Sequence, residues 1–166
     1  SKRDSMLIRF ERIPLVQLPS DSVLCSSNQP LLLEAISVSG NNYQWSGGSG
    51  NYSNPNASST YYTPAANELT STIQLTLTTY GVVCNSSSDQ IRLTFLPLPQ
   101  IQVTDTVRLC PNQITSVTAN VINSSLTEWF LGSTILSTSN QLTYSMSLSE
   151  YIYVRAANSL GCSVVD

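Results

Sequence analysis

The chain has 166 residues, of which 41% are hydrophobic and 10% are charged, with a formal charge of −3 and no histidine. This apolar content is enough for a hydrophobic core and excludes an intrinsically disordered chain. The seven Lys and Arg residues are too few and too scattered to form the basic patch that binds nucleic acid. No apolar run approaches the roughly 20 residues of a membrane helix. We therefore expect neither a nucleic-acid partner nor membrane insertion.

The first predicted strand belongs to an internal repeat. Residues 8–15 read IRFERIPL, and residues 91–98 read IRLTFLPL, an ungapped match. Each segment is followed by an Asp-Ser/Thr-Val triplet and then by a cysteine. The repeat predicts that residues 1–13 are the closing strand of a preceding unit, that residues 14–97 form unit 1, and that residues 98–166 form unit 2 without its last strand.

The opening strand has no place in unit 1, which already contains the matching strand. Ile8 and Phe10 alternate with Arg9 and Glu11, so the two apolar side chains are predicted to face a core. An open sheet edge in unit 2 would invite strand addition. We predict that Met6 to Ile13 completes the second sandwich of a preceding copy, either by strand donation in a fibre or within a continuous polypeptide.

The remaining apolar runs are short and rich in Leu, Val, Ile, Thr and Tyr, which is typical of strands. Ile73, Leu75 and Leu77 alternate with polar residues, as in half-buried strands. The runs are separated by segments rich in Gly, Asn, Ser and Pro, which favour turns. They cover residues 31–38, 73–79, 91–95, 101–103, 114–121 and 151–156. This pattern predicts an all-β fold of two tandem Ig-like antiparallel β-sandwiches.

The cysteines repeat in the order Cys…Trp…Cys that is typical of Ig-like domains. The four cysteines, Cys25, Cys84, Cys110 and Cys162, allow three pairings. We predict Cys25–Cys84 and Cys110–Cys162 at one end of each sandwich, because each pair then stays inside its own unit. Such bonds indicate an extracellular protein. The alternative is four buried free thiols.

The aromatic residues are predicted to be mainly structural. Trp45 and Trp129 lie between the paired cysteines in sequence and are predicted to fill the two cores rather than to stack on a ligand. The tyrosines could form a sugar-binding strip, which keeps surface glycans as a candidate partner. The favoured interpretation is that they are strand residues with a buried ring. They are Tyr61, Tyr62, Tyr144, Tyr151 and Tyr153.

Catalytic and metal-binding patterns are lacking in the sequence. Without histidine there is no Ser-His-Asp or Cys-His arrangement, and the cysteines lack the close spacing of zinc sites. The acidic residues form no obvious glycosidase pair in sequence. We therefore expect no enzymatic activity, no metal and no cofactor.

Several segments carry a family resemblance. In the first unit they are Tyr43 to Gly50, Tyr62-Thr-Pro64, and Ile73 to Thr79 leading to Cys84; in the second they are Leu109-Cys-Pro111, the stretch around Trp129, and Tyr151 to Val154 leading to Cys162. The chain resembles the tandem Ig-like and PKD-like repeats of giant surface adhesins in Bacteroidota, exported by the type IX system and including gliding-motility adhesins.

The resemblance implies an extracellular structural or adhesive module of a long cell-surface adhesin or filament. Its partners would be neighbouring repeat units or identical copies. The alternative function is a carbohydrate-binding or accessory module of a secreted hydrolase. The triplets that contain Ser5, Ser22 and Thr106 also resemble the Asp-Ser/Thr-aliphatic acceptor of O-glycosylation in Bacteroidota, although they could equally be ordinary strand starts.

Overall fold

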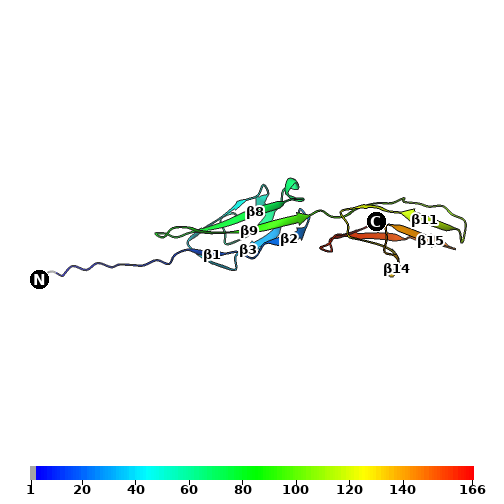
Figure 1. The fold of residues 1–166 in the computed structure, drawn as a ribbon. Helices are drawn as coiled ribbons and strands as arrows, with labels where there is room; N and C mark the ends of the chain where they lie inside the picture. Colours follow the sequence, from blue (N-terminus) through cyan, green and yellow to red (C-terminus); the bar gives the residue numbers. More distant parts are fainter. Residues whose placement is uncertain (1–2) are drawn as a thin grey trace. The chain divides into compact units, whose positions relative to one another are not determined.

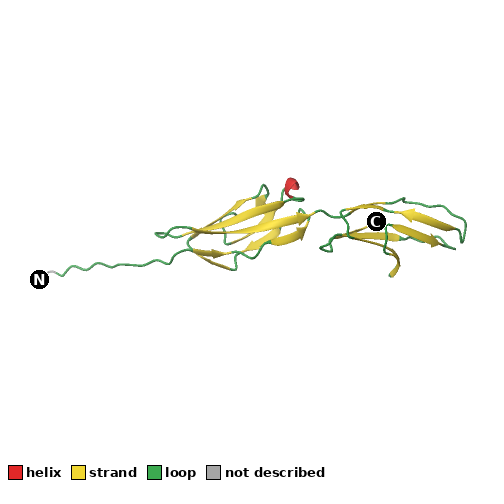
Figure 2. Ribbon diagram, in the orientation of Figure 1, coloured by secondary structure: helices red, strands yellow, loops and turns green. Residues whose placement is uncertain are grey.

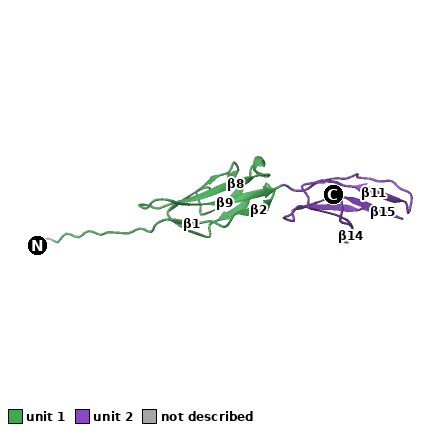
Figure 3. Cartoon of the chain, viewed as in Figure 1, with its two compact units in different colours: residues 1–96 green, residues 97–166 purple. Residues whose placement is uncertain are grey.

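The computed structural model describes residues 3–166, and residues 1 and 2 of the predicted closing segment lie outside this range. The chain divides into two compact units, residues 1–96 and 97–166 (Figure 3). Strands dominate both units, with one short 3₁₀ helix in the described residues (Figure 2). The predicted all-β fold is therefore confirmed.

Unit 1 contains nine strands and the 3₁₀ helix within its described residues (Figure 1). The first sheet has the order β2-β9-β8-β5, the second has the order β3-β7-β6, and β1 pairs with β4. The elements are β1 (Leu15–Gln17), β2 (Ser22–Cys25), β3 (Leu31–Glu34), β4 (Ser37–Ser39), β5 (Asn42–Gly47), β6 (Asn51–Tyr52), β7 (Ser59–Thr63), η1 (Ala66–Glu68), β8 (Thr72–Tyr80) and β9 (Ser87–Leu96).

The core of unit 1 follows from period-two alternation in its strands. In β8, Ile73, Leu75 and Leu77 are buried, whereas the residues between them are exposed or half-buried. Successive side chains of a strand point to opposite faces, so one face of β8 is apolar. The buried residues of unit 1 are Val16, Leu18, Leu33, Trp45, Tyr62, Ile73, Leu75, Leu77, Ile91, Leu93 and Phe95.

One strand pair of unit 1 departs from the antiparallel pattern expected from the sequence. Strand β9 pairs with β8 in the antiparallel sense but with β2 in the parallel sense. Ser22 lies opposite Leu93, and Cys25 lies opposite Leu96. Strand β9 is therefore central in its sheet, held on both sides, and its buried side chains make up a large part of the core.

The glycine-rich turn after β5 folds over the buried Tyr62. A Cβ atom at Gly48, where φ is +65°, would come within 2.0 Å of the Tyr62 hydroxyl oxygen. A Cβ atom at Gly50 would lie 2.2 Å from the carbonyl oxygen of Thr63. Glycine is required at both positions because the backbone approaches its neighbours too closely for a side chain.

Unit 2 repeats the layout with shorter strands. Its strands form the sheet β14-β13-β16-β17 and the two pairs β11-β15 and β10-β12. Its buried core cluster consists of Ala119, Trp129, Leu142 and Val154. The strands are β10 (Gln100–Gln102), β11 (Ile114–Thr118), β12 (Asn120–Ile122), β13 (Leu126–Leu131), β14 (Thr134–Ser137), β15 (Gln141–Ser145), β16 (Tyr153–Ala157) and β17 (Ser163–Val165).

Candidate functional site

The cysteines of unit 1 lie at opposite ends of that unit. Cys25 ends β2 and lies opposite Leu96, the last residue of β9. Cys84 precedes the first residue of β9, a strand of ten residues. At about 3.3 Å per residue, β9 separates the two by roughly 30 Å, whereas a disulfide needs Cα atoms within about 7 Å. The predicted Cys25–Cys84 bond is therefore incompatible with this fold.

The cysteines of unit 2 are also far apart along the unit. Cys110 lies near the end of β15, because the neighbouring Asn112 amide donates to the carbonyl oxygen of Met146 (2.8 Å). Cys162 lies beyond the opposite end of β16, where its carbonyl accepts from the Asn158 amide (3.0 Å). Cys84 and Cys110 are free cysteines in the described chain, whereas Cys25 and Cys162 are disulfide-bonded. Neither within-unit pair is formed, which corrects the predicted pairing.

Both tryptophans are buried, each with an exposed fraction of 3%. The indole of Trp45 donates to the carbonyl oxygen of Ala57, and that of Trp129 donates to the carbonyl oxygen of Ser139, each at 3.0 Å. Each ring therefore fills a core and satisfies its one polar atom.

Unit 2 has an open groove of about 950 Å³ between residues 103–111 and residues 146–154. Trp129, Leu142 and Tyr144 are also among its lining residues. In unit 1 the corresponding segments are β2 and β8, and β9 lies between them and pairs with both. The open groove thus lies at the place that β9 occupies in unit 1.

The strand register shows which positions of β9 have no counterpart in unit 2. Leu77 pairs with Trp45 and with Asp89 in unit 1. Val154 pairs with Trp129 in unit 2 and exchanges two backbone hydrogen bonds of 2.9 Å with Asp166. Asp166 therefore corresponds to Asp89. In the described chain, no residue of unit 2 takes the positions that correspond to residues 90–96 of β9.

The segment that matches β9 lies outside both sandwiches. Residues 3–14 form no strand, and they are drawn in Figure 2 as a loop that extends from unit 1. The exposed fraction is 63% for Ile8, 94% for Phe10 and 78% for Ile13. These apolar side chains have no core to fill within the described residues of unit 1.

The three candidate O-glycosylation residues have different environments. Ser5 and Thr106 are exposed and lie outside strands. Ser22 is half-buried and begins β2, and the carboxylate of the preceding Asp21 accepts a hydrogen bond from the Arg92 amide (2.9 Å). The triplet at Ser22 thus has the geometry of a strand start, while Ser5 and Thr106 are sterically more accessible.

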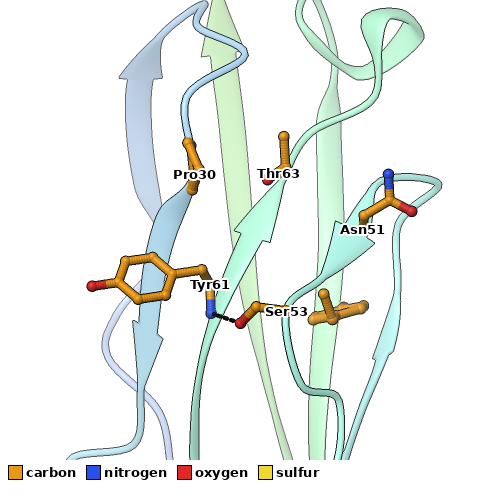
Figure 4. A pocket seen from close by; sticks show the side chains of 6 residues that line it. Pro30, Asn51, Ser53, Tyr61 and Thr63 are labelled. Carbon is orange, nitrogen blue, oxygen red and sulfur yellow. Dashed lines mark hydrogen bonds between the residues drawn. The ribbon is translucent and has the colours of Figure 1, made fainter.

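The tyrosines do not form one strip. Tyr62 is completely buried, whereas Tyr61 lines a shallow surface hollow of about 450 Å³ (Figure 4). The other residues of the hollow are Pro30, Asn51, Tyr52, Ser53 and Thr63. Tyr144, Tyr151 and Tyr153 line the open groove of unit 2.

Unit 1 also contains a buried carboxylate that the sequence analysis did not identify. Glu68 is 3% exposed and accepts hydrogen bonds from the amides of Ser49 (2.6 Å) and Ala65 (2.8 Å) and from the Tyr62 hydroxyl. Burial alone would raise the pKa of Glu68, but these hydrogen bonds outweigh it and lower the pKa below its ordinary value. Burial, followed by the bond to Glu68, raises the pKa of Tyr62 to about 12.

The Glu68 cluster has the character of a structural network. Each carboxylate oxygen of Glu68 accepts one backbone amide, and the Gly50 amide donates to the Tyr62 hydroxyl oxygen (2.9 Å). No group of three His, Cys, Asp or Glu residues suited to a metal ion occurs within residues 3–166. In the same range, none of the helical structure is long and apolar enough to cross a membrane.

No protein-family model and no curated protein matches the sequence. The fold is similar to the N-terminal eight Ig domains of Down syndrome cell adhesion molecule (12% identity, TM-score 0.65), covering 93% of this chain and 27% of that chain. It is also similar to a titin I-band fragment (13% identity, TM-score 0.52; 95% and 64% covered) and to Ig domains 1–5 of Sidekick-1 (14% identity, TM-score 0.50; 93% and 38% covered). The chain is a tandem of Ig-like domains and spans less than two thirds of these structures.

Proposed function

We propose that the chain is an extracellular structural or adhesive repeat module, of the Bacteroidota surface-adhesin type, whose copies join by strand complementation. Residues 6–13 of one copy would fill the open groove of unit 2 in a neighbouring copy. The observation that supports this most directly is that an exposed segment matching β9 coexists with a groove at the place of β9. An apolar strand and an unpaired sheet edge each gain from such pairing.

The repeat sets the register of the incoming strand. Ile8 corresponds to Ile91 and Phe10 to Leu93, both of which are buried in unit 1. In this register Ile8 would lie opposite the partly buried Ile152 and Phe10 opposite Glu150, and both of these partners line the open groove. The donated strand would therefore complete an apolar core that is small in unit 2 alone.

The opposite charges of Arg12 and Glu150 support residues 6–13 as the segment that fills the open groove. Arg12 corresponds to Phe95 of β9, and Glu150 corresponds to Ile73 of β8, because Val154 corresponds to Leu77. Phe95 and Ile73 are inward-facing diagonal neighbours in unit 1. Opposite charges at these positions would replace that apolar contact. Glu150 is exposed and lines the open groove.

The proposal is tested with a synthetic peptide of residues 4–14. The acceptor is the full chain carrying Phe10→Asp, to prevent self-association, and Trp45→Phe, so that Trp129 is the only tryptophan. We expect saturable binding that changes the fluorescence of Trp129, since this ring lines the open groove. The matched control is the same peptide with Ile8→Asp and Phe10→Asp, which should not bind.

A charge exchange tests the register. The peptide with Arg12→Glu should bind at least about tenfold more weakly, an effect of roughly 1.4 kcal/mol. An acceptor with Glu150→Lys should restore its binding. Equal binding of the Asp-substituted control peptide, or an unchanged Trp129 signal at millimolar peptide, would refute strand complementation.

A second candidate function is glycan binding at the hollow beside Tyr61. This ring is 51% exposed and lines the hollow together with Tyr52. Exposed aromatic faces suit stacking on sugar rings. Glycan-array binding that is lost with Tyr61→Ala and kept with Tyr80→Ala, a change at an exposed tyrosine outside the hollow, would favour this function.

A further inference from the structure

Cys84 and Cys110 are the two free cysteines of the described chain. Cys110 is exposed and Cys84 is half-buried. In the repeat, Cys84 corresponds to Cys162 and Cys110 corresponds to Cys25. Both of these counterparts are disulfide-bonded. The free pair thus occupies positions at which the same chain already forms disulfides.

The two disulfide-bonded cysteines, Cys25 and Cys162, both belong to segments that contact the end of β9 or the residue just after it. Cys25 lies beside Leu96 in the parallel pairing of β2 with β9. Cys162 lies in a loop whose Asn158 side chain donates to the carbonyl oxygen of Pro97 (3.1 Å). The two neighbouring residues, Leu96 and Pro97, correspond in the repeat to Ile13 and Pro14.

Cys84 lies close to Ile13 and Pro14. Its thiol contacts the carbonyl oxygen of Glu11 (3.7 Å). The loop before it packs closely on Pro14, because a Cβ atom at Gly81 would lie 3.0 Å from the Pro14 ring. Cys84 is therefore held near the end of the segment that carries the donor strand.

Cys110 would reach the same place when the strand is donated. In the register of unit 1, Cys25 lies opposite Leu96, so Cys110 would lie opposite Ile13 of the incoming strand. Paired strands are about 4.8 Å apart, so Cys110 would lie one strand spacing from Ile13, two residues beyond the Glu11 carbonyl that Cys84 contacts. The donor's Cys84 and the acceptor's Cys110 would thus meet at one junction.

We propose that Cys84 of one copy and Cys110 of the next form a disulfide that locks the complemented strand in place. This inference rests on the proposed strand complementation. One thiolate attacks a small-molecule disulfide such as oxidised glutathione, which releases one thiol and leaves a mixed disulfide. The other cysteine thiolate then displaces the second thiol. Two protons and two electrons leave the cysteines, and the oxidant is reduced to two thiols.

The test uses two full-length variants, Cys84→Ser and Cys110→Ser, incubated with oxidised glutathione alone and as a mixture. Non-reducing electrophoresis should show a covalent dimer in the mixture, because only there does one copy offer Cys84 while the other offers Cys110. Peptide mapping should find Cys84 linked to Cys110. Each variant alone should give at least about tenfold less dimer. The unsubstituted chain should form longer covalent ladders.

Phe10→Asp in the copy that retains Cys84 separates the two proposals. If strand donation aligns the thiols, this change should reduce the mixed dimer at least about tenfold. Peptide binding to the open groove without a Cys84–Cys110 link would refute the disulfide and leave the proposed function standing. Dimers linked Cys84–Cys84 or Cys110–Cys110, or a mixed dimer that survives Phe10→Asp, would overturn the inferred junction.

Discussion

Replacing the buried carboxylate of Glu68 should destabilise unit 1 selectively. In Glu68→Gln, an NH₂ group takes the place of one carboxylate oxygen, so it faces the amide of either Ser49 or Ala65. One buried N–H then loses its acceptor, at a cost of about 1–3 kcal/mol. The bonds that remain also lose the strength that the charge adds. We expect a total loss of about 2–4 kcal/mol in the free energy of unfolding.

The assay is urea unfolding of the full chain with Trp129→Phe, which leaves Trp45 as the reporter of unit 1. Trp45 stacks on Tyr52, which contacts Tyr62, so its fluorescence follows the region above Glu68. The matched control is Glu34→Gln, because Glu34 is exposed at the end of β3. A change below about 0.5 kcal/mol in Glu68→Gln, the range typical of surface substitutions, would refute the structural role of the network.

The pH dependence supplies an independent check. The folded pKa of Glu68 is lower than the ordinary value of 4.5. Its ionised form therefore stabilises unit 1 above the unfolded pKa, and this stabilisation is lost as the pH falls through the folded pKa. The stability difference between the unsubstituted chain and Glu68→Gln should be largest near neutral pH and should shrink below about pH 4.5. A difference that stays constant down to pH 2.5 would contradict this assignment.

Trp129→Ala should lower the free energy of unfolding of unit 2 by about 3–5 kcal/mol, as expected for a large buried aromatic. The unfolding midpoint of unit 1, reported by Trp45 fluorescence, should not change. An effect on unit 2 below about 1 kcal/mol would contradict the core role of Trp129. Gly48→Ala should lower the stability of unit 1 by about 1–3 kcal/mol, because φ is +65° and the added Cβ would meet the Tyr62 hydroxyl. Gly132→Ala is the control for backbone strain alone, since φ is +59° there but no atom lies within 4 Å. Equal effects in thermal unfolding would mean that the Tyr62 contact contributes nothing.

Period-two alternation predicted the core-facing residues of β8, because it is a local property of the sequence, but it did not predict the breaks that divide residues 31–38 and 114–121 into two strands each. Ile73, Leu75 and Leu77 face the core as their spacing indicated. The disulfide pairs were predicted wrongly because pairing depends on which end of a unit each cysteine reaches. Cys84 precedes a strand of ten residues and Cys25 lies beside its last residue, and neither distance can be derived from sequence separation.

The open groove was likewise only partly predictable from the sequence. The internal match of residues 8–15 with residues 91–98 predicted a segment of β9 type ahead of unit 1, and its pairing with unit 2 stays a prediction. The correspondence of Glu150 with Ile73 required the observed register, since the strands of unit 2 differ in length from those of unit 1. The Glu68 network was missed because two of its donors, the Ser49 amide and the Tyr62 hydroxyl, come from a turn and from β7, and only the Ala65 amide is close in sequence.

The parallel pairing of β2 with β9 has a mechanical consequence. Strand β2 lies near the start of the unit 1 sandwich, and β9 ends it. Tension applied to the two ends of the unit would pull these parallel strands in opposite directions along their length, so the hydrogen bonds between them would share the load in shear. In unit 2, residues 104–109 have no such strand partner in the described chain. The shear contact of unit 1 therefore has no counterpart within the described residues of unit 2, where the proposed strand complementation would supply one.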